Sequence, residues 1–459
     1  MENTKTTGNR GKFILFYPTI ENLWEHVWFP FPYLYLPPFL EEAGFEVEII
    51  DARVEKDWRG LLREEIGDAI GFGMTGMSGP DLIVAIEACN IVKGLKPGIP
   101  VVWGGHHAKI RPDQLLQEGL ADYVINGRGE HSLVKLLITL EGKRVVDDIE
   151  GLVYINNGKV KTNAPIPYIG FDYDILPAYH LFDLEKYRSQ NNIVGYLSAQ
   201  GCPFHCSFCT EKDYTFTYRT DEQLKRELNF LIKEKGFMSL FFHDGTFFVS
   251  RKRVLKIARL FLEEYPGVKW KGNARANSLL KYSDDELKLL VDSGLRSVFF
   301  GVESASQKVL ENMEKKITPE QVLKSAKICV DYGFEFYASF MFATPGETVD
   351  DLKQNIDLMN KIKEINPNAT LQNSVYIPLP GTDMYYMCLE RGFVPPKTTL
   401  EWSSRDITSN FENRDDISWI EPSVLKEYIK VYDEAFPNYK HVFQREKAGE
   451  YESPLKKQL

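Results

Sequence analysis

Short apolar runs alternate with longer segments of helical periodicity along most of the chain. In the first third, five runs have the pattern of β-strands, at residues 13–17, 47–50, 69–73, 101–104 and 123–125. Segments between them, such as 83–93, place apolar residues on one face of a helix. Strands separated by helix-length segments predict βαβ units and a parallel sheet. We therefore expect an α/β, Rossmann-like domain over residues 1–145.

Residues 146–188 have the pattern of a linker. Within them, residues 151–160 predict a β-hairpin that turns at Asn157-Gly158. Pro165, Pro167 and Pro177 then mark an irregular crossing.

The βα alternation resumes over residues 189–385. Strand-like runs occur at residues 193–198, 239–242, 269–272, 297–300, 334–342 and 374–377. Helical segments such as 224–235 and 253–264 separate them, which predicts a partial (β/α)6 barrel. Residues 386–459 are expected to form a small, mostly helical C-terminal region, with a helix over 422–435.

Composition limits the class of protein. A length of 459 residues exceeds one ordinary hydrophobic core, so two or three domains are expected. Contents of 43% hydrophobic and 26% charged residues are typical of a globular protein. The 65 acidic residues outnumber the 55 basic ones, and no basic block stands out. Because phosphate contacts need clustered Lys and Arg, nucleic acid is not an expected partner.

The cysteines and apolar runs predict a cytoplasmic protein. Six cysteines in a chain of this length do not form a disulfide framework, and reduced thiols indicate the cytosol. The N-terminus lacks an apolar signal core. The apolar stretch from Leu23 to Leu40 is interrupted by four prolines, so it cannot form one continuous membrane helix. We therefore expect no transmembrane segment.

Cys202, Cys206 and Cys209 have the spacing C-x3-C-x2-C and follow the strand-like run 193–198. A loop after a strand can direct three thiolates toward one point. Iron–sulfur clusters are usually held by four cysteines, so three would leave one iron with an open position. A structural zinc site, with His205 or a remote residue as the fourth ligand, and inert buried thiols are the alternatives.

Polar residues follow several predicted barrel strands, at the ends where barrels place their sites. Asp244 could bind an ammonium group, Arg275 a carboxylate, and Glu303 with Ser304 the hydroxyls of a ribose. Each could instead cap the helix that follows it.

The predicted strands of the first third end in glycines and small polar residues. They are Thr75, Ser78, Gly104, Gly105, His106 and Gly127. Glycines allow a bulky ligand to approach the backbone closely, and parallel sheets bind ligands at these ends. Ordinary tight turns are the alternative. His106 and His107 could be ligands or a polar lining.

These motifs resemble two known families. The cysteine spacing, with Phe208 before the last cysteine, is the signature of the radical S-adenosylmethionine (SAM) enzymes. Gly301-Val302-Glu303-Ser304 and residues 341–348 are similar to later segments of that family. Residues 103–108 and 122–130 resemble the cobalamin-binding domain that precedes many radical SAM cores, without the Asp-x-His-x-x-Gly motif of other cobalamin proteins. The resemblance spans about residues 12–385.

The resemblance implies one [4Fe–4S] cluster on Cys202, Cys206 and Cys209, because only Cys89, Cys329 and Cys388 lie elsewhere. It implies SAM contacts by Phe208, Asp244, Arg275, Glu303 and Ser304. Cobalamin would bind at Thr75, Ser78, Gly104, Gly105, His106 and Gly127. A flavodoxin or ferredoxin would supply electrons, and the substrate would be a small molecule.

The reaction implied by the resemblance is reductive cleavage of SAM to a 5′-deoxyadenosyl radical. Cobalamin would then methylate an unactivated carbon of a small molecule or natural product. Radical cyclisation, ring rearrangement or carbon–carbon coupling without methyl transfer is an alternative within the family. A non-catalytic cobalamin or metal sensor, with zinc on the cysteines, is the alternative from another class.

Overall fold

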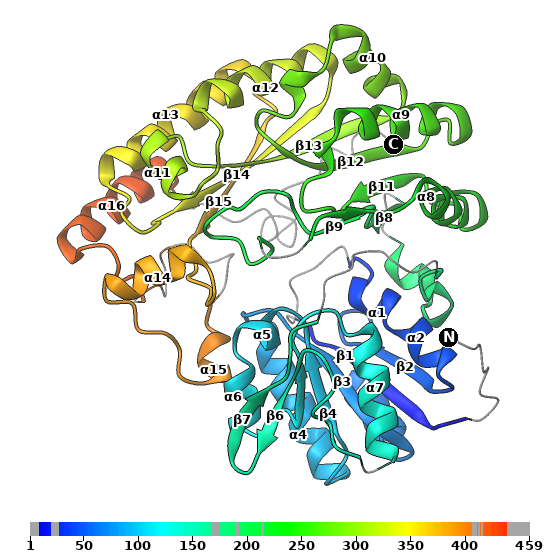
Figure 1. Cartoon of the computed structure of the whole chain (residues 1–459). Helices are drawn as coiled ribbons and strands as arrows, with labels where there is room; N and C mark the ends of the chain where they lie inside the picture. Colours follow the sequence, from blue (N-terminus) through cyan, green and yellow to red (C-terminus); the bar gives the residue numbers. More distant parts are fainter. Residues whose placement is uncertain are drawn as a thin grey trace. The chain divides into compact units, whose positions relative to one another are not determined.

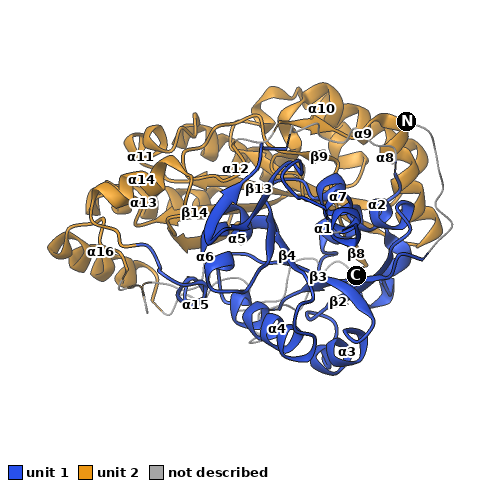
Figure 2. Cartoon of the chain, turned by 60° about the horizontal axis from the view of Figure 1, so that its bottom comes forward, with its two compact units in different colours: residues 1–169, 173–187, 395–406 blue, residues 170–172, 188–394, 407–459 orange. Residues whose placement is uncertain are grey.

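The computed structural model describes residues 9–19, 27–142, 144–166, 175–188, 192–212, 215–405, 411, 414 and 416–437. The chain divides into two compact units (Figure 2). Unit 1 contains residues 1–169, 173–187 and 395–406, and unit 2 contains residues 170–172, 188–394 and 407–459. The predicted boundaries place residues 395–406 in the C-terminal region, whereas the structure joins them to unit 1.

Unit 1 is built on a seven-stranded sheet in the order β2-β1-β3-β4-β5-β6-β7 (Figure 1). The strands are β1 (Lys12–Tyr17), β2 (Glu46–Asp51), β3 (Ala69–Thr75), β4 (Val101–Gly104), β5 (Tyr123–Ile125), β6 (Leu152–Asn156) and β7 (Lys159–Thr162). The first five strands are parallel, which confirms the predicted Rossmann-like sheet. Strands β6 and β7 add antiparallel, and Asn157 and Gly158 turn between them with φ of 50° and 74°.

Helices connect these strands. They are α1 (Phe31–Tyr35), α2 (Pro37–Glu42), α3 (Trp58–Glu65), α4 (Asp81–Leu95), α5 (Gly105–Ile110), α6 (Pro112–Gln117) and α7 (Glu130–Glu141). Unit 1 also includes α15 (Thr399–Trp402), which belongs to the segment 395–406 and does not connect these strands. Helix α3 packs against α4, and α2 packs against α7. Trp58, Trp103 and Trp402 belong to one buried cluster, so α15 contributes to the core of unit 1.

In the described part of the stretch interrupted by prolines, the chain forms two short helices. Prolines occupy the first positions of both α1 and α2, where a backbone N–H would have no partner within the helix. Among the described residues, the structure has no helix with the length and hydropathy needed to cross a bilayer.

Unit 2 is built on six parallel strands in the order β15-β14-β13-β12-β11-β8, as the partial barrel predicts. They are β8 (Ile193–Tyr196), β11 (Ser239–Phe242), β12 (Lys269–Arg275), β13 (Leu295–Glu303), β14 (Glu335–Phe342) and β15 (Thr370–Val375). A short antiparallel pair, β9 (Ala199–Gln200) and β10 (Thr217–Tyr218), flanks the cysteine loop. Strand β15 begins four residues before the predicted 374–377, because its ladder with β14 includes the polar Gln372 and Asn373.

Helices cover the outer face of this sheet (Figure 1). They are α8 (Asp221–Leu228), which continues as a π-helix over Asn229–Glu234, α9 (Arg251–Glu264), α10 (Asp284–Asp292), α11 (Gln307–Asn312), α12 (Pro319–Tyr332), α13 (Val349–Ile365), α14 (Asp383–Glu390) and α16 (Pro422–Ala435). Short 3-10 turns lie at Phe247–Val249 and Leu279–Lys281 in this unit, and at Tyr179–Leu181 and Leu184–Tyr187 in unit 1. Capping boxes at Thr220, Ser283, Thr318 and Thr348 fix the starts of α8, α10, α12 and α13. The predicted bounds of α16 are confirmed.

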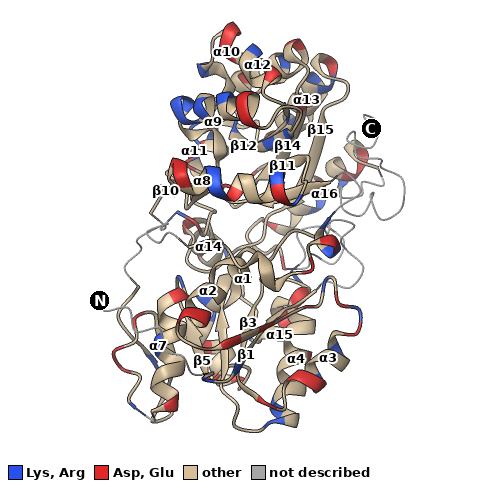
Figure 3. Cartoon of the chain, turned by 90° about the vertical axis from the view of Figure 1, so that its right-hand side faces the viewer, with Lys and Arg blue, Asp and Glu red and all other residues tan. Residues whose placement is uncertain are grey.

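Both signs of charge occur on the outer helices, for example on α8 and α10 (Figure 3). The acidic side chains cluster in the first turns of α8, α10 and α13, where they complement the helix dipole.

Helix α16 is joined to the end of β14 through a buried carboxyl group. The Tyr428 hydroxyl donates to Glu347 at 2.8 Å and accepts the backbone N–H of Ala343 at 3.1 Å. Thr344 donates to the same carboxyl from its backbone N–H, at 2.8 Å, and from its hydroxyl. Burial outweighs these donors and raises the pKa of Glu347 to about 7.

Glu347→Gln should remove a pH dependence of the stability of unit 2. The pKa of Glu347 is higher in the folded chain than its ordinary value of 4.5, so the folded state binds the extra proton between these values. Stability then falls as pH rises from about 4.5 to about 7, by up to about 3 kcal/mol. Denaturant unfolding at pH 4.5 and 7.5 should show this slope in the wild type and in Glu364→Gln, an exposed control on α13. An equal slope in Glu347→Gln would contradict this assignment.

Candidate active site

The three predicted cysteines lie in the irregular loop between β9 and β10 and line one cavity of about 280 Å³ in unit 2. Phe204, Phe208, Arg275 and Glu303 line the same cavity. The structure therefore brings the cysteines together with three of the residues predicted to contact SAM: Phe208, Arg275 and Glu303.

Asp244, by contrast, holds the strand that leads into the cysteine loop. Its carboxylate accepts the backbone N–H groups of Ser198 and Ala199, at 2.7 and 2.9 Å, and the Ser198 hydroxyl at 2.6 Å. The side chain is buried and does not line the cavity, whereas the next two residues, Gly245 and Thr246, do. Asp244 thus fixes where the loop begins, and a contact with SAM stays a prediction.

Arg275 brings positive charge to the cysteines. Its Nη1 donates toward the Cys206 Sγ at 3.6 Å, and its guanidinium lies 4.1 Å from the centre of the Phe204 ring. Burial raises the pKa of Cys209 to about 11, although the N–H of Glu211 donates to its Sγ. Metal binding requires thiolates, so loading this site should release protons.

Glu303 and Lys315 form a buried ion pair beside Phe208. The Lys315 Nζ lies 2.7 Å from the Glu303 Oε1 and 5.6 Å from the centre of the Phe208 ring. Glu303 has φ of 64°, and Glu314 and Lys316, on either side of Lys315, each have φ of 51°. Left-handed backbone in residues other than glycine costs about 1–3 kcal/mol and concentrates at functional sites. Both charged side chains line the cavity.

Ser304 points elsewhere. It is buried, donates to the Asn355 Oδ1 at 3.1 Å and accepts the backbone N–H of Ser306. It does not line the cavity, and Ser306 rather than Ser304 caps α11. Its predicted contact with a ribose is therefore not supported by its position, and it stays untested.

Several lining residues were not predicted, including Thr246, Asn273, Lys315 and Ser339. Thr246 and Asn273 stand at the ends of β11 and β12, so the strand-end rule could have found them. Lys315 lies 12 residues after Glu303, between two helices, and no local pattern marks it. A sequence cannot show that a loop returns to a site formed by earlier strands.

The cysteine cavity offers the kind of ligand that iron–sulfur clusters use. Within the described part of the chain, no three His, Cys, Asp or Glu side chains lie close enough together to hold one metal ion. The three thiols instead surround a shared hollow, and thiolates are the usual ligands of iron–sulfur clusters. Gly245 lines the same cavity.

A second candidate site lies at the carboxyl ends of the unit 1 strands. Thr75 ends β3 and pairs with Gly104 at the end of β4, while His106 and Gly127 follow β4 and β5. Gly105 has φ of 81°, and a Cβ there would lie 2.1 Å from the Thr75 Oγ1. The absence of a side chain at Gly105 thus makes room for the Thr75 side chain at these strand ends.

The loop after β3 contacts the helix that follows β4 through the side chains of Ser78 and His107. The Ser78 hydroxyl lies 2.9 Å from the His107 Nδ1, and the His107 ring contacts Trp402 edge to face at 6.3 Å. Burial lowers the pKa of His107 to about 3 and that of His106 to about 4. Both imidazoles are therefore neutral at pH 7. His107 therefore positions the Ser78 side chain through this hydrogen bond.

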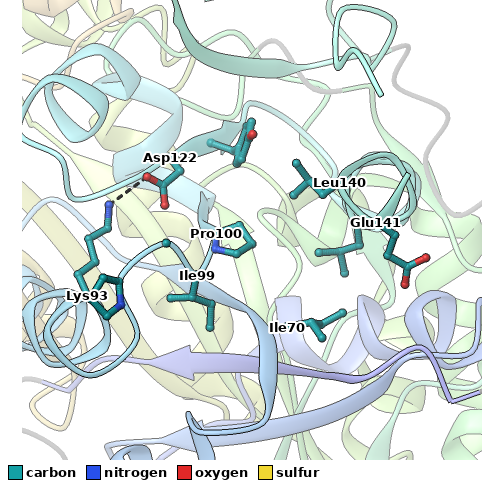
Figure 4. A pocket seen from close by; sticks show the side chains of 11 residues that line it. Ile70, Lys93, Ile99, Pro100, Asp122, Leu140 and Glu141 are labelled. Atoms are coloured by element: carbon teal, nitrogen blue, oxygen red, sulfur yellow. Dashed lines mark hydrogen bonds and ion pairs between the residues drawn. The ribbon is translucent and has the colours of Figure 1, made fainter. Parts of the chain in front are cut away.

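A larger cavity, of about 720 Å³, lies at the amino ends of the strands of the same sheet (Figure 4). Ile70, Pro100 and Tyr123 at the starts of strands line it, and the ion pair of Lys93 and Asp122 borders it. None of the six residues predicted for cobalamin lines it. Parallel sheets bind ligands at the carboxyl ends of their strands, so a ligand site at Thr75 and Gly105 stays a prediction.

Comparisons with known proteins match both units. The model of the radical SAM superfamily matches residues 196–359, and that of the B12 binding domain matches residues 24–137. The chain is 28% identical over 383 residues to an uncharacterised methyltransferase of Pyrococcus horikoshii, covering 81% of this chain and 80% of that protein.

One further relative and one solved structure are similar to this chain. An anaerobic magnesium-protoporphyrin IX monomethyl ester cyclase of Rubrivivax gelatinosus is 28% identical over 375 residues, which cover 78% of this chain and 66% of the cyclase. The structure of the radical SAM methyltransferase TsrM from Kitasatospora setae, with cobalamin and a [4Fe–4S] cluster bound, aligns with a TM-score of 0.69 at 20% identity. That alignment covers 84% of this chain and 76% of TsrM, and it confirms the fold.

Proposed function

Because the chain belongs to the radical SAM superfamily, in the branch with a B12 binding domain, and is a radical SAM enzyme, we propose that it methylates an unactivated carbon of a small-molecule substrate with the help of cobalamin. The observation that carries the proposal is the shared cavity of Cys202, Cys206 and Cys209 with Arg275 and Glu303. When bound, the cluster and SAM supply a 5′-deoxyadenosyl radical, and cobalamin supplies a transferable methyl group.

The residues of unit 2 have distinct roles in this proposal. The three thiolates hold the cluster, and Arg275 stabilises the charge of Cys206 through its guanidinium. Glu303 and Lys315 present opposite charges in the same cavity, which suits a ligand that carries an ammonium and a carboxylate, as SAM does. Phe208 offers a flat ring on which an adenine can stack.

The residues of unit 1 would hold cobalamin at the carboxyl edge of its sheet. The support is the backbone surface around Gly104 and Gly105 and the hydroxyls of Thr75 and Ser78. Three predictions from the sequence complete the proposal. They are contacts of His106 and Gly127 with cobalamin, a flavodoxin or ferredoxin as electron donor, and a cytoplasmic location.

Gly105→Ala should weaken cobalamin binding about tenfold or more, because the new Cβ would overlap the Thr75 hydroxyl and displace the edge. Gly98→Ala is the matched control. Gly98 has a similar φ of 89° but lies at the opposite edge with no atom within 4 Å of its Cβ position. Absorbance titration with hydroxocobalamin measures both dissociation constants. An equal change in the two variants would mean that backbone strain alone acts.

The proposal is tested by anaerobic purification with cobalamin supplied, followed by iron and cobalamin analysis and incubation with SAM carrying a deuterated methyl group. Iron, stoichiometric cobalamin and transfer of the label to a cellular extract component would support it. Iron and 5′-deoxyadenosine without cobalamin would reject methyl transfer and favour cyclisation or coupling, the activity class of the Rubrivivax relative. Zinc in place of iron would favour a sensor.

A further inference from the structure

The barrel sheet has one covered face and one that is only partly covered. Side chains alternate between the faces of a strand. Along β14, Phe336, Ala338, Phe340 and Phe342 are buried, whereas the residues between them are half-buried. Helices α10 and α12 pack on strands β13 and β14 (Figure 1). The half-buried positions therefore belong to the inner face of the barrel.

Three rings form a row across this inner face. The Phe299 ring of β13 stacks on the Tyr337 ring of β14, with centroids 4.6 Å apart and planes 11° apart. On its other side it stacks on Phe241 of β11, at 5.9 Å and 28°. All three side chains are half-buried, and the Lys271 Nζ lies 4.8 Å from the centre of the Phe241 ring. We call Phe241, Phe299 and Tyr337 the aromatic row.

The aromatic row continues the wall of the cysteine cavity. Phe299 lines that cavity together with Cys206 and Cys209. Ser339, two residues beyond Tyr337 on the same face of β14, lines it as well. A ligand that lies against the row is thus adjacent to the place where the cysteines hold their cluster.

We propose that the aromatic row binds the substrate and that the substrate carries a planar, conjugated ring system. This inference rests on the proposed function and specifies its substrate class. Ligand sites are concave surfaces lined mainly by apolar and aromatic groups. Because the three rings stack on one another, the row offers their edges, and ring edges pair well with the face of a flat partner. Asn273 and Ser339, on the neighbouring inner positions, supply polar contacts at the edge of the ring system.

The test compares a planar and a saturated compound of similar size. Full-length protein carrying its cluster, with SAM present, is dialysed to equilibrium against 2-naphthol or decahydro-2-naphthol. Wild type should retain 2-naphthol at least about fivefold more tightly, since edge-to-face ring contacts add to the effect of buried area. Tyr337→Leu should weaken 2-naphthol binding about five- to tenfold, and Tyr337→Phe, which keeps the ring, should stay within about twofold.

Tyr386→Leu is the matched control, because Tyr386 lies on α14 of the same unit and is 54% exposed. Iron content and melting temperature show that each variant is folded. Equal retention of the two compounds by wild type, no retention of 2-naphthol, or equal losses in Tyr337→Leu and Tyr386→Leu would each overturn the inference.

The same samples separate this inference from the proposed function. Reduced wild type is assayed for 5′-deoxyadenosine. Cleavage of SAM without a preference for the planar compound would overturn only the role of the aromatic row. A preference for the planar compound, lost in Tyr337→Leu, without SAM cleavage would support the binding surface and reject the radical reaction.

Discussion

Cys206→Ala should abolish both iron binding and SAM cleavage. Cys206 is the most buried cysteine of the three that line the cavity, and its Sγ lies 3.6 Å from the Arg275 guanidinium. Its loss leaves two cysteines, too few for a stable cluster, and removes the sulfur to which Arg275 donates. We expect iron to fall to the background and 5′-deoxyadenosine to be undetectable after reduction.

Cys329→Ala is the matched control for this prediction. Cys329 is buried in α12, outside the cavity, and burial raises the pKa of its thiol well above the ordinary value. The variant should keep its iron and its SAM cleavage. Iron analysis and chromatography of 5′-deoxyadenosine measure both variants. Full iron in Cys206→Ala would refute the assignment of the cluster to this loop.

Trp402→Ala should lower the free energy of unfolding of unit 1 by about 3–5 kcal/mol, the usual cost of removing a buried tryptophan. The Trp402 side chain is completely buried, and its Nε1 donates to the Gln114 Oε1 at 3.0 Å. Its loss leaves a cavity beside His107 and a buried amide oxygen without its donor. The loop that carries Ser78 should loosen with it.

Hydrogen exchange resolved by peptide is the suitable measurement, because two units need not unfold together. Peptides from β3 and β4 should exchange faster in Trp402→Ala, while those from β13 and β14 stay unchanged. Leu400→Ala, on the same helix but 59% exposed, should leave both sets unchanged. Faster exchange of β13 and β14 alone would show that residues 395–406 stabilise unit 2 instead.

Local patterns accounted for much of the fold. The five parallel strands of unit 1, the Asn157-Gly158 turn and the bounds of α16 follow from periodicity, turn chemistry and helix-starting residues. These features depend on neighbours within a few positions, so the sequence displays them directly. Strand β15 was misplaced because its ladder with β14 includes polar residues.

The candidate site, too, could be predicted from the sequence only in part. The cysteine spacing and the strand-end positions of Arg275 and Glu303 were readable, because parallel strands end at a common edge. The directions in which the side chains after the strands point could not be predicted from the sequence. Asp244 and Ser304 also follow strands, yet both turn into hydrogen bonds that support loops rather than into the cavity.

The sequence by itself thus determined the two α/β units, the three neighbouring thiols and the polar residues at the strand ends, since these depend on residue type and short-range spacing. Only the tertiary structure decided that Lys315 pairs with Glu303, that Trp402 completes the core of unit 1, and that Phe241, Phe299 and Tyr337 form one aromatic row. Each of these depends on contacts between residues far apart in the chain. Such contacts are fixed by packing and strand register, which no local pattern encodes.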